Sequence, residues 1–255
     1  MSTVDWDAAA VLTLTELDVA WELAGLGEPP LELELPSPGT TVAERAHIVA
    51  DATNSLARRG LAEDRRPSPW LTALLTTLAR PDVSVDVRVR GRTLVGGVAA
   101  RRAGAAVLAV RHRDEVAVVP IPPTRMPAAV VEVVGDVRPG AGKPVSVARV
   151  DLEAALDAGD PITAEGGHPL STDDELVRGL SLSAISAIMR MYGDVDRHGQ
   201  IGVRVGGRRS AHVVAVHRGS TGWFARVDHR DHVTVAPVDG PGLVRRIEDL
   251  IAEAT

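Results

Sequence analysis

The sequence predicts an α+β protein of two quasi-symmetric halves, in which a central antiparallel sheet of meander strands is flanked by helical bundles. Two observations predict this fold class: short segments recur at a nearly constant offset, and runs of alternating apolar residues lie between helix-like segments. We therefore expect a single domain over residues 1–255 with an internal duplication. Its N-terminal half would be 1–136, its junction 137–143 and its C-terminal half 144–255.

Two pairs of segments carry the internal similarity. The segment HRDEVAVVP at 112–120 returns as HRDHVTVAP at 229–237, with six of nine positions identical at an offset of 117. The shorter VRVRGR at 87–92 returns as VRVGGR at 203–208, with five of six positions identical at an offset of 116. Two matches at nearly one offset indicate a duplication rather than coincidence between strands rich in valine and arginine.

The first half is expected to contain helices followed by a four-stranded meander and a further helix. Helical spacing covers 41–59, where Gly60 provides a C-cap, and 69–79, which Pro81 stops. The expected strands are 83–90, 93–100, 105–110 and 116–121, with short turns at Gly91, Gly104 and Arg113-Asp114. A helix over 125–134 follows.

The second half repeats this order. Thr172 to Glu175 forms a capping-box pattern, Gly179 is expected to break the helix, and a second helix is expected over 182–192. Expected strands are 201–205, 211–217, 222–227 and 233–238, and a last helix covers 241–254. The two meanders should join or pack closely, because four strands with few aromatic residues are only marginally stable alone.

Composition excludes several classes of function. The net charge of −6 argues against nucleic-acid binding through a basic surface, and 2% aromatic residues argue against base stacking. The absence of cysteine excludes disulfides, thiol catalysis and cysteine metal sites. The sequence contains no uninterrupted apolar run of about 18 residues, so no membrane span is expected. The first ten residues do not resemble a secretory signal. A cytoplasmic location is expected.

Motifs for catalysis or cofactor binding are incomplete. The segment 138–144 resembles a phosphate loop but has Pro144 where serine or threonine is required. Both His-Arg-Asp triplets lack the asparagine of a kinase catalytic loop and are expected to be hairpin turns. The segment 228–232 holds two histidines and two aspartates, but a turn seldom directs neighbouring side chains toward one metal ion. We therefore expect no catalytic, cofactor-binding or metal-binding residues.

A succession of short segments resembles the EspG family, chaperones of actinobacterial type VII (ESX) secretion. The resemblance covers nearly the whole chain, and it rests on the order of individually weak matches. These are LTLTELD at 12–18, WELAGLG at 21–27, LELEL at 31–35, PSPGTT at 36–41, Glu44-Arg45, LARRGL at 56–61, LARPDV at 78–83, VDVR at 85–88, GQIGV at 199–203 and Arg208.

The resemblance implies a cytosolic chaperone that is not an enzyme. It implies binding of PE–PPE heterodimers at the tip of the PPE helical bundle, which keeps these clients soluble and directs them to the secretion system. The free protein would be a monomer or a weak homodimer. Two alternatives stay open: an enzyme with a site between the halves near His229 and His232, and a homo-oligomeric structural module whose sheet edges pair.

The resemblance also places the client surface on one half of the molecule, around a hairpin between early strands and the helices of the C-terminal half. The helical segment in question covers residues 180–192. It contains apolar side chains whose spacing lets most of them face the core. The candidate partner-binding residues are Arg88, Arg90, Arg92, Thr93, Leu182, Ile185, Met189, Met191 and Tyr192.

Overall fold

A computed structural model describes residues 4–157, 172–228 and 230–255, with side chains given for 4–153, 182–228 and 230–255. The first half contains η1 (Trp6–Ala8), β1 (Ala10–Thr13), α1 (Leu14–Leu23), η2 (Leu31–Leu33), α2 (Val42–Arg58), β2 (Ala62–Glu63), β3 (Arg66–Pro67), α3 (Pro69–Ala79), β4 (Val83–Arg90), β5 (Leu94–Arg102), β6 (Ala105–His112), β7 (Glu115–Ile121), η3 (Pro123–Arg125) and α4 (Met126–Val134). The second half contains β8 (Val145–Ala148), α5 (Arg149–Asp157), α6 (Thr172–Met191), β9 (Arg197–Val205), β10 (Arg208–Arg209), β11 (Val214–Gly219), β12 (Gly222–Asp228), β13 (His232–Pro237) and α7 (Gly240–Ala254).

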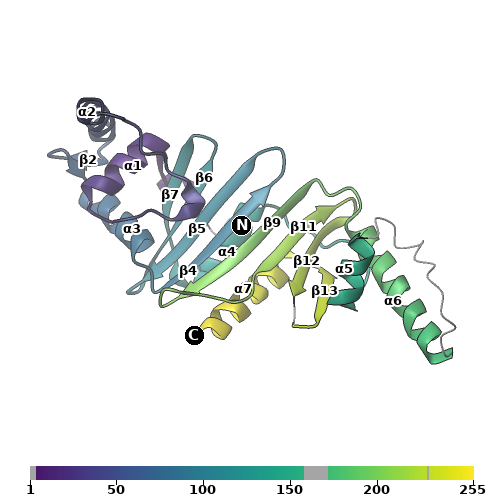
Figure 1. Ribbon diagram of the computed structural model, residues 1–255. Coiled ribbons are helices and arrows are strands. Elements are labelled where there is room, and N and C mark those ends of the chain that lie inside the picture. The colour runs from purple at the N-terminus through teal and green to yellow at the C-terminus, as the bar shows by residue number, and fades with distance from the viewer. Residues whose placement is uncertain (1–3, 158–171, 229) are drawn as a thin grey trace.

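One antiparallel sheet runs through the whole molecule. Among the described residues, eleven strands form it, in the order β1-β7-β6-β5-β4-β9-β11-β12-β13-β8 with β10 added to β9. The order of the first half from β4 outward, β4-β5-β6-β7-β1, is repeated by β9-β11-β12-β13-β8 in the second half. Both halves thus contain an edge strand, helices, a four-stranded meander and a final helix (Figure 1). The predicted fold class is confirmed.

The two halves join along β4 and β9, and their register defines a pseudo-two-fold axis. Asp86 pairs with Gly202, which is the residue 116 positions later and hence its own counterpart in the repeat. The pair on one side, Val85 with Val203, corresponds to the pair on the other side, Val87 with Ile201. The axis therefore passes through the pair Asp86 and Gly202 at the centre of the sheet.

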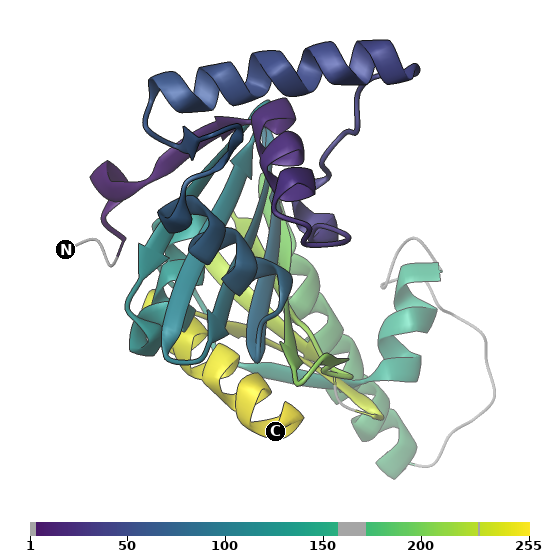
Figure 2. The ribbon, with the colours of Figure 1, turned by 90° about the vertical axis from the view of Figure 1, so that its left-hand side faces the viewer.

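Alternation along the strands sends apolar side chains to different helices on the two faces. On one face, the four buried valines of β4 (Val83, Val85, Val87 and Val89) pack with their β9 counterparts under α4 and α7. On the other face, α1 and α3 cover the first-half strands, and α5 and α6 cover the outer second-half strands. Figures 1 and 2 show α1–α3 at one end of the molecule, α6 at the other, and α2 lying across the first end outside α1.

Local sequence explains where the helices begin. The side chains of Thr13 and Thr41 each accept a hydrogen bond from the backbone N–H three residues later. The carboxylates of Glu16 and Glu44 in turn accept one from the backbone N–H of Thr13 and Thr41, so both helix starts are capping boxes. The α3 helix begins with Ser68 as N-cap and proline in the first turn. These signals made α2 and α3 predictable to within one residue.

The structure corrects the sequence prediction at several points. Helix α6 is continuous from Thr172 to Met191, so Gly179 does not break it; one glycine in a long helix costs only about 1 kcal/mol relative to alanine. Two four-residue edge strands, β1 and β8, were not predicted, because such short segments show too little alternation. His232 begins β13, three strands from β9, so it does not lie between the halves, and His229 lies outside the described residues. Of the second His-Arg-Asp triplet, Arg230 and Asp231 are described, and they lie between β12 and β13.

Residues 136–140, which span the end of the expected first half and the start of the expected junction, are held against β12. The Trp223 N–H donates to the Arg138 carbonyl at 2.8 Å, and the Gly140 N–H donates to the Trp223 carbonyl at 3.0 Å. The Trp223 indole N–H donates to the Asp136 carbonyl at 3.0 Å. This connection is therefore an ordered part of the second half's packing.

Candidate functional site

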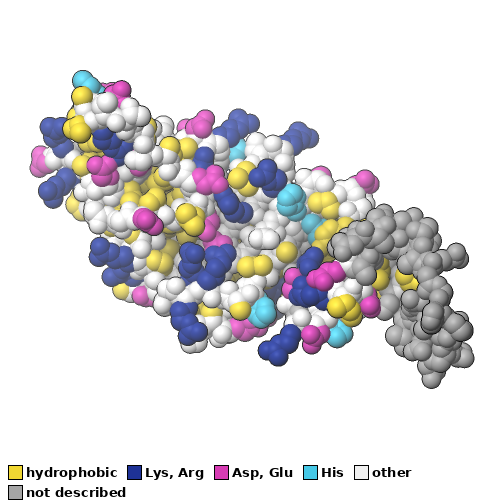
Figure 3. All heavy atoms as spheres, in the orientation of Figure 1, with side chains coloured by type: hydrophobic (Ala, Val, Ile, Leu, Met, Phe, Trp, Pro, Cys, Tyr) yellow, Lys and Arg dark blue, Asp and Glu magenta, His cyan; other side chains and the backbone are white. Residues whose placement is uncertain are grey.

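Within the described residues, no helix covers the centre of one sheet face. On this open face, β4 directs Asp86, Arg88 and Arg90 outward, and β9 directs His198 and Gln200 outward beside them. Alternate residues of the same strands are buried against α4 and α7, which fixes the orientation of the outward set. In Figure 3, basic side chains are scattered over the middle of this face, between the two ends that carry helices.

The first-half side of the open face is bordered by the segment that contains η2. Arg88 forms an ion pair with Glu34, and Arg111 donates to the carbonyl oxygens of Leu33 and Glu34 at 2.9 and 2.8 Å. Glu34 has a left-handed backbone, with φ of 43°, which turns the chain directly after η2. The two arginines thus hold this segment across β4, β5 and β6.

The second-half side is bordered by the end of α6. Ile185, Ile188 and Met191 are buried against Phe224 and strands β8 and β13. His217 is 3% exposed and lies between Tyr192 and Phe224, with ring centroids 3.9 and 5.3 Å away. Its Nε2 hydrogen-bonds to the Met191 carbonyl at 3.1 Å. Burial lowers the pKa of His217, so its neutral form is favoured.

The β4–β5 hairpin lies next to the segment that follows α6. A Cβ placed on Gly91 would be 3.3 Å from Nε of Arg197 and 3.6 Å from the carbonyl oxygen of Asp196. Arg197 in turn donates to the Val134 carbonyl at 3.1 Å, and Arg218 holds Asp196 through two hydrogen bonds. The hairpin therefore lies beside the segment that leads from α6 into β9, at one end of the sheet.

A cleft of about 420 Å³ lies beside this junction on the open face. Its polar lining includes His198, Gln200 and His212 together with Tyr192 and Arg226. Arg226 is held by Asp228 through two hydrogen bonds of 2.7 and 3.2 Å. Burial raises the pKa of the Tyr192 phenol, and Arg226 opposes that shift. We call this cleft the histidine cleft.

The structure places the predicted partner-binding residues in two groups. Arg90, Arg92 and Thr93 belong to the hairpin or its flank, while Arg88 lies further along β4 in its ion pair with Glu34. On α6, Leu182 and Met189 are 44% and 37% exposed. Ile185 and Met191 are buried, and Tyr192 is half-buried over His217.

Several residues that shape this surface were not identified from sequence. Arg197 and His198 precede the predicted strand, and His217 and Arg226 lie on strands whose contacts with α6 span more than 25 residues. His198 pairs with Arg90 on β4 and with His217 on β11. Both pairings became known only from the strand registers in the structure.

No group of three or more histidine, aspartate or glutamate side chains among the described residues could hold a metal ion. Within the same residues, no helix is long and apolar enough to cross a membrane.

Comparison with known proteins identifies the fold. The structure is similar to the Mycobacterium tuberculosis type VII secretion system chaperone EspG5, solved in complex with a PE25–PPE41 dimer, with a TM-score of 0.72 over 95% of both chains and 15% sequence identity. No curated protein sequence matches the chain significantly. The family model for the EspG family matches residues 13–249, which is nearly the whole sequence. The chain therefore belongs to the EspG family.

Proposed function

We propose that this protein is a cytoplasmic chaperone of type VII secretion, without enzymatic activity, that binds a PE–PPE-type heterodimer and directs it to the secretion system. The observation that carries the proposal is the match of 95% of the chain to EspG5, a chaperone solved with a bound PE25–PPE41 dimer. Family membership over residues 13–249 supports the same function.

The proposed client surface comprises the exposed face of α6 and the β4–β5 hairpin, which lies beside the segment that follows α6. Leu182 and Met189 are seven residues apart on α6, so they share one helix face, and both are exposed. Methionine adapts its shape to an apolar partner. Ile185 and Met191 pack beneath them and hold the helix in place.

Hairpin residues would provide the polar rim of this surface. Arg90 and Arg92 are exposed, and Thr93 is half-buried beside them. Guanidinium groups at the rim of an interface steer association and select partners more than they add affinity. Arg88 would act indirectly, because its ion pair with Glu34 holds the η2 segment at the edge of the open face.

Covering a client's exposed apolar helical tip is a physical mechanism for a chaperone. Large exposed apolar patches promote aggregation, and a protein that buries such a patch keeps the client soluble until it is handed on. A helix tip contacting Leu182 and Met189 would bury apolar area on both partners. The exposed part of α6 supplies such a surface without opening the core.

The test is co-expression with the PE–PPE-type pair encoded in the same gene neighbourhood. Size-exclusion chromatography should show a stable heterotrimer with the wild-type protein. The double variant Leu182→Glu with Met189→Glu should lose it, because two carboxylates would be buried without partners. The matched control is Val42→Glu on α2, where the valine is 89% exposed and remote from α6.

Failure of the wild-type protein to bind every such pair would overturn the proposed function. If Val42→Glu abolished the complex and the double variant kept it, the client surface would instead lie at the first-half end. Circular dichroism of each variant establishes that the fold is intact.

A further inference from the structure

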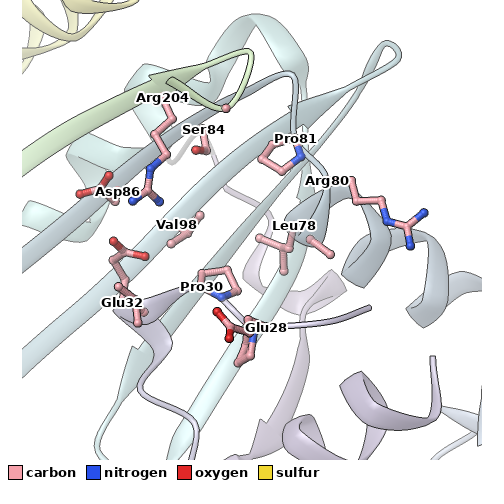
Figure 4. A pocket seen from close by; sticks show the side chains of 14 residues that line it. Glu28, Pro30, Glu32, Leu78, Arg80, Pro81, Ser84, Asp86, Val98 and Arg204 are labelled. Atoms are coloured by element: carbon pink, nitrogen blue, oxygen red, sulfur yellow. The ribbon is translucent and has the colours of Figure 1, made fainter. Parts of the chain in front are cut away.

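A second pocket opens on the same face at the first-half side. It has a volume of about 500 Å³ and lies where residues 28–32 pass over β4 and β5 (Figure 4). Ser84 lines it, and its repeat counterpart Gln200 lines the histidine cleft. The linings of the two cavities otherwise differ.

The distinctive group in this pocket is the carboxylate of Glu32. Glu32 is only 9% exposed, and its carboxylate points into the pocket (Figure 4). Among the described residues, it accepts no hydrogen bond and forms no ion pair within 4 Å. No fully buried side-chain oxygen among the described residues lacks a hydrogen-bond partner, so the Glu32 carboxylate keeps contact with solvent in the pocket. A cationic ligand that donates hydrogen bonds to it there would gain a charge-assisted interaction.

The neighbouring Asp86 does not compete for the same ligand. Arg209 donates to both of its oxygens at 2.9 and 3.0 Å, which satisfies its charge. Arg204 lines the opposite wall and points toward Asp86 and Glu32 without pairing with either within 4 Å (Figure 4). Glu28 adds an exposed carboxylate at the rim. Arg209 also attracts Glu32 electrostatically from a longer distance, but Glu32 has no direct hydrogen bond or ion pair in the buried part of the pocket.

The remaining wall is apolar. Pro30, Leu78 and Val98 line the space beside Glu32. A ligand that fills this space needs an aliphatic stem against these side chains and a cationic, multiply donating end against the carboxylate. An arginine side chain has both features, and its planar guanidinium matches a carboxylate through two parallel hydrogen bonds.

We propose that this pocket binds a guanidinium group on a short aliphatic stem, with Glu32 as its carboxylate partner. The group can come from an arginine side chain of a bound client or from a free guanidinium compound. The proposal does not rest on the chaperone function, because the free protein already presents the pocket.

The first test is calorimetric titration of the full chain with 1-butylguanidine. We expect saturable binding that Glu32→Gln weakens at least tenfold and that Arg204→Ala strengthens, because that variant removes a like charge. The matched control Glu63→Gln removes an exposed carboxylate of β2 outside the pocket and should bind as the wild type does. Uncharged 1-pentanol should not bind the wild-type protein at comparable concentrations.

Absence of saturable binding to the wild type, or equal binding of 1-pentanol, overturns the proposal without any variant. Unchanged binding by a folded Glu32→Gln variant also overturns it. Co-expression with the client pair then distinguishes the two sources. Loss of the heterotrimer only in Glu32→Gln assigns the site to a client arginine, and an unchanged heterotrimer assigns it to a free compound. Failure of the wild-type heterotrimer concerns the proposed function alone.

Discussion

At the residue scale, a glycine at the centre of the sheet makes room for an ion pair between the two halves. Gly202 lies opposite Asp86 on the pseudo-two-fold axis, and the space of its absent Cβ is occupied by the guanidinium of Arg209 and the carboxylate of Asp86. The ion pair between Arg209 and Asp86 therefore crosses from one half to the other. Gly199, on the same strand, instead leaves room for the main-chain carbonyl of Arg88.

This difference predicts unequal costs for two alanine substitutions. Gly202→Ala would displace only side chains, so we expect a loss of about 1 kcal/mol in the free energy of unfolding. Gly199→Ala would collide with the backbone of β4, and we expect a loss of roughly 2–3 kcal/mol because the strands must separate. Urea unfolding measures both values, and a larger loss for Gly202→Ala would contradict the assignment.

His217 predicts a pH dependence of stability. Burial lowers its pKa in the folded state, so the unfolded chain binds more protons as the pH falls below about 6.5. This contribution to stability is complete above the unfolded pKa and is lost as the pH falls through it toward the lowered folded pKa. His217→Phe keeps an aromatic ring between Tyr192 and Phe224 but cannot titrate. Wild-type protein should therefore lose more stability than His217→Phe between pH 7 and 5, as measured by urea unfolding. Equal losses would show that His217 does not carry the effect.

At the element scale, α6 combines two roles on different faces. One face carries Ile185, Ile188 and Met191 into the second-half core, and another exposes Leu182 and Met189. The helix therefore has to be anchored by one set of residues before the other set can form a surface. Its counterpart α3 in the first half is bordered by α1 and the η2 segment, so the two halves differ most at these helices.

The two faces predict opposite results for adjacent residues. Ile188→Ala should reduce the free energy of unfolding by about 2–4 kcal/mol, because it leaves a cavity at a fully buried position. Met189→Ala should change it by less than about 0.5 kcal/mol, since that side chain is 37% exposed. Chemical denaturation of both variants tests this, and similar losses would mean that α6 packs in another orientation.

At the scale of the whole molecule, the halves share one sheet instead of forming two separate cores. The valines of β4 and β9 pack into one cluster with α4 and α7, so neither half covers its apolar surface alone. The division into residues 1–136 and 144–255 is therefore proposed as a record of duplication, with a single cooperative folding unit as its result.

A nick between the halves tests this cooperativity. A protease site inserted between Gly142 and Lys143 leaves the hydrogen bonds of Arg138 and Gly140 to Trp223 intact. The cleaved protein should elute as one species and unfold in one thermal transition, because β4, β9, α4 and α7 still hold the pieces together. Two separate transitions, or separation of the pieces under native conditions, would contradict a shared core.

Sequence patterns were sufficient where the signal is local. The alternating valines of β4, the Ala103-Gly104 turn with positive φ at both residues, and the capped starts of α2 and α3 all depend on near neighbours. The repeat of the His-Arg-Asp segments predicts the duplication without any structural information, and the duplication itself stays a prediction. The hairpin and α6 were identified as candidate sites, and their role in client binding stays a prediction.

Only the tertiary structure decided which residues meet across long separations. The register of β4 and β9 places Asp86 on the symmetry axis, and no local pattern specifies a pairing across 116 residues. The same holds for the stacking of His217 on Tyr192 and for the position of the Glu32 backbone over β5, because both depend on how separate segments cross the sheet. By itself the sequence determined the fold class and the resemblance to a family, and it predicted the duplication. Burial, which depends on packing and not on local propensity, decided which face of each element is available to a partner.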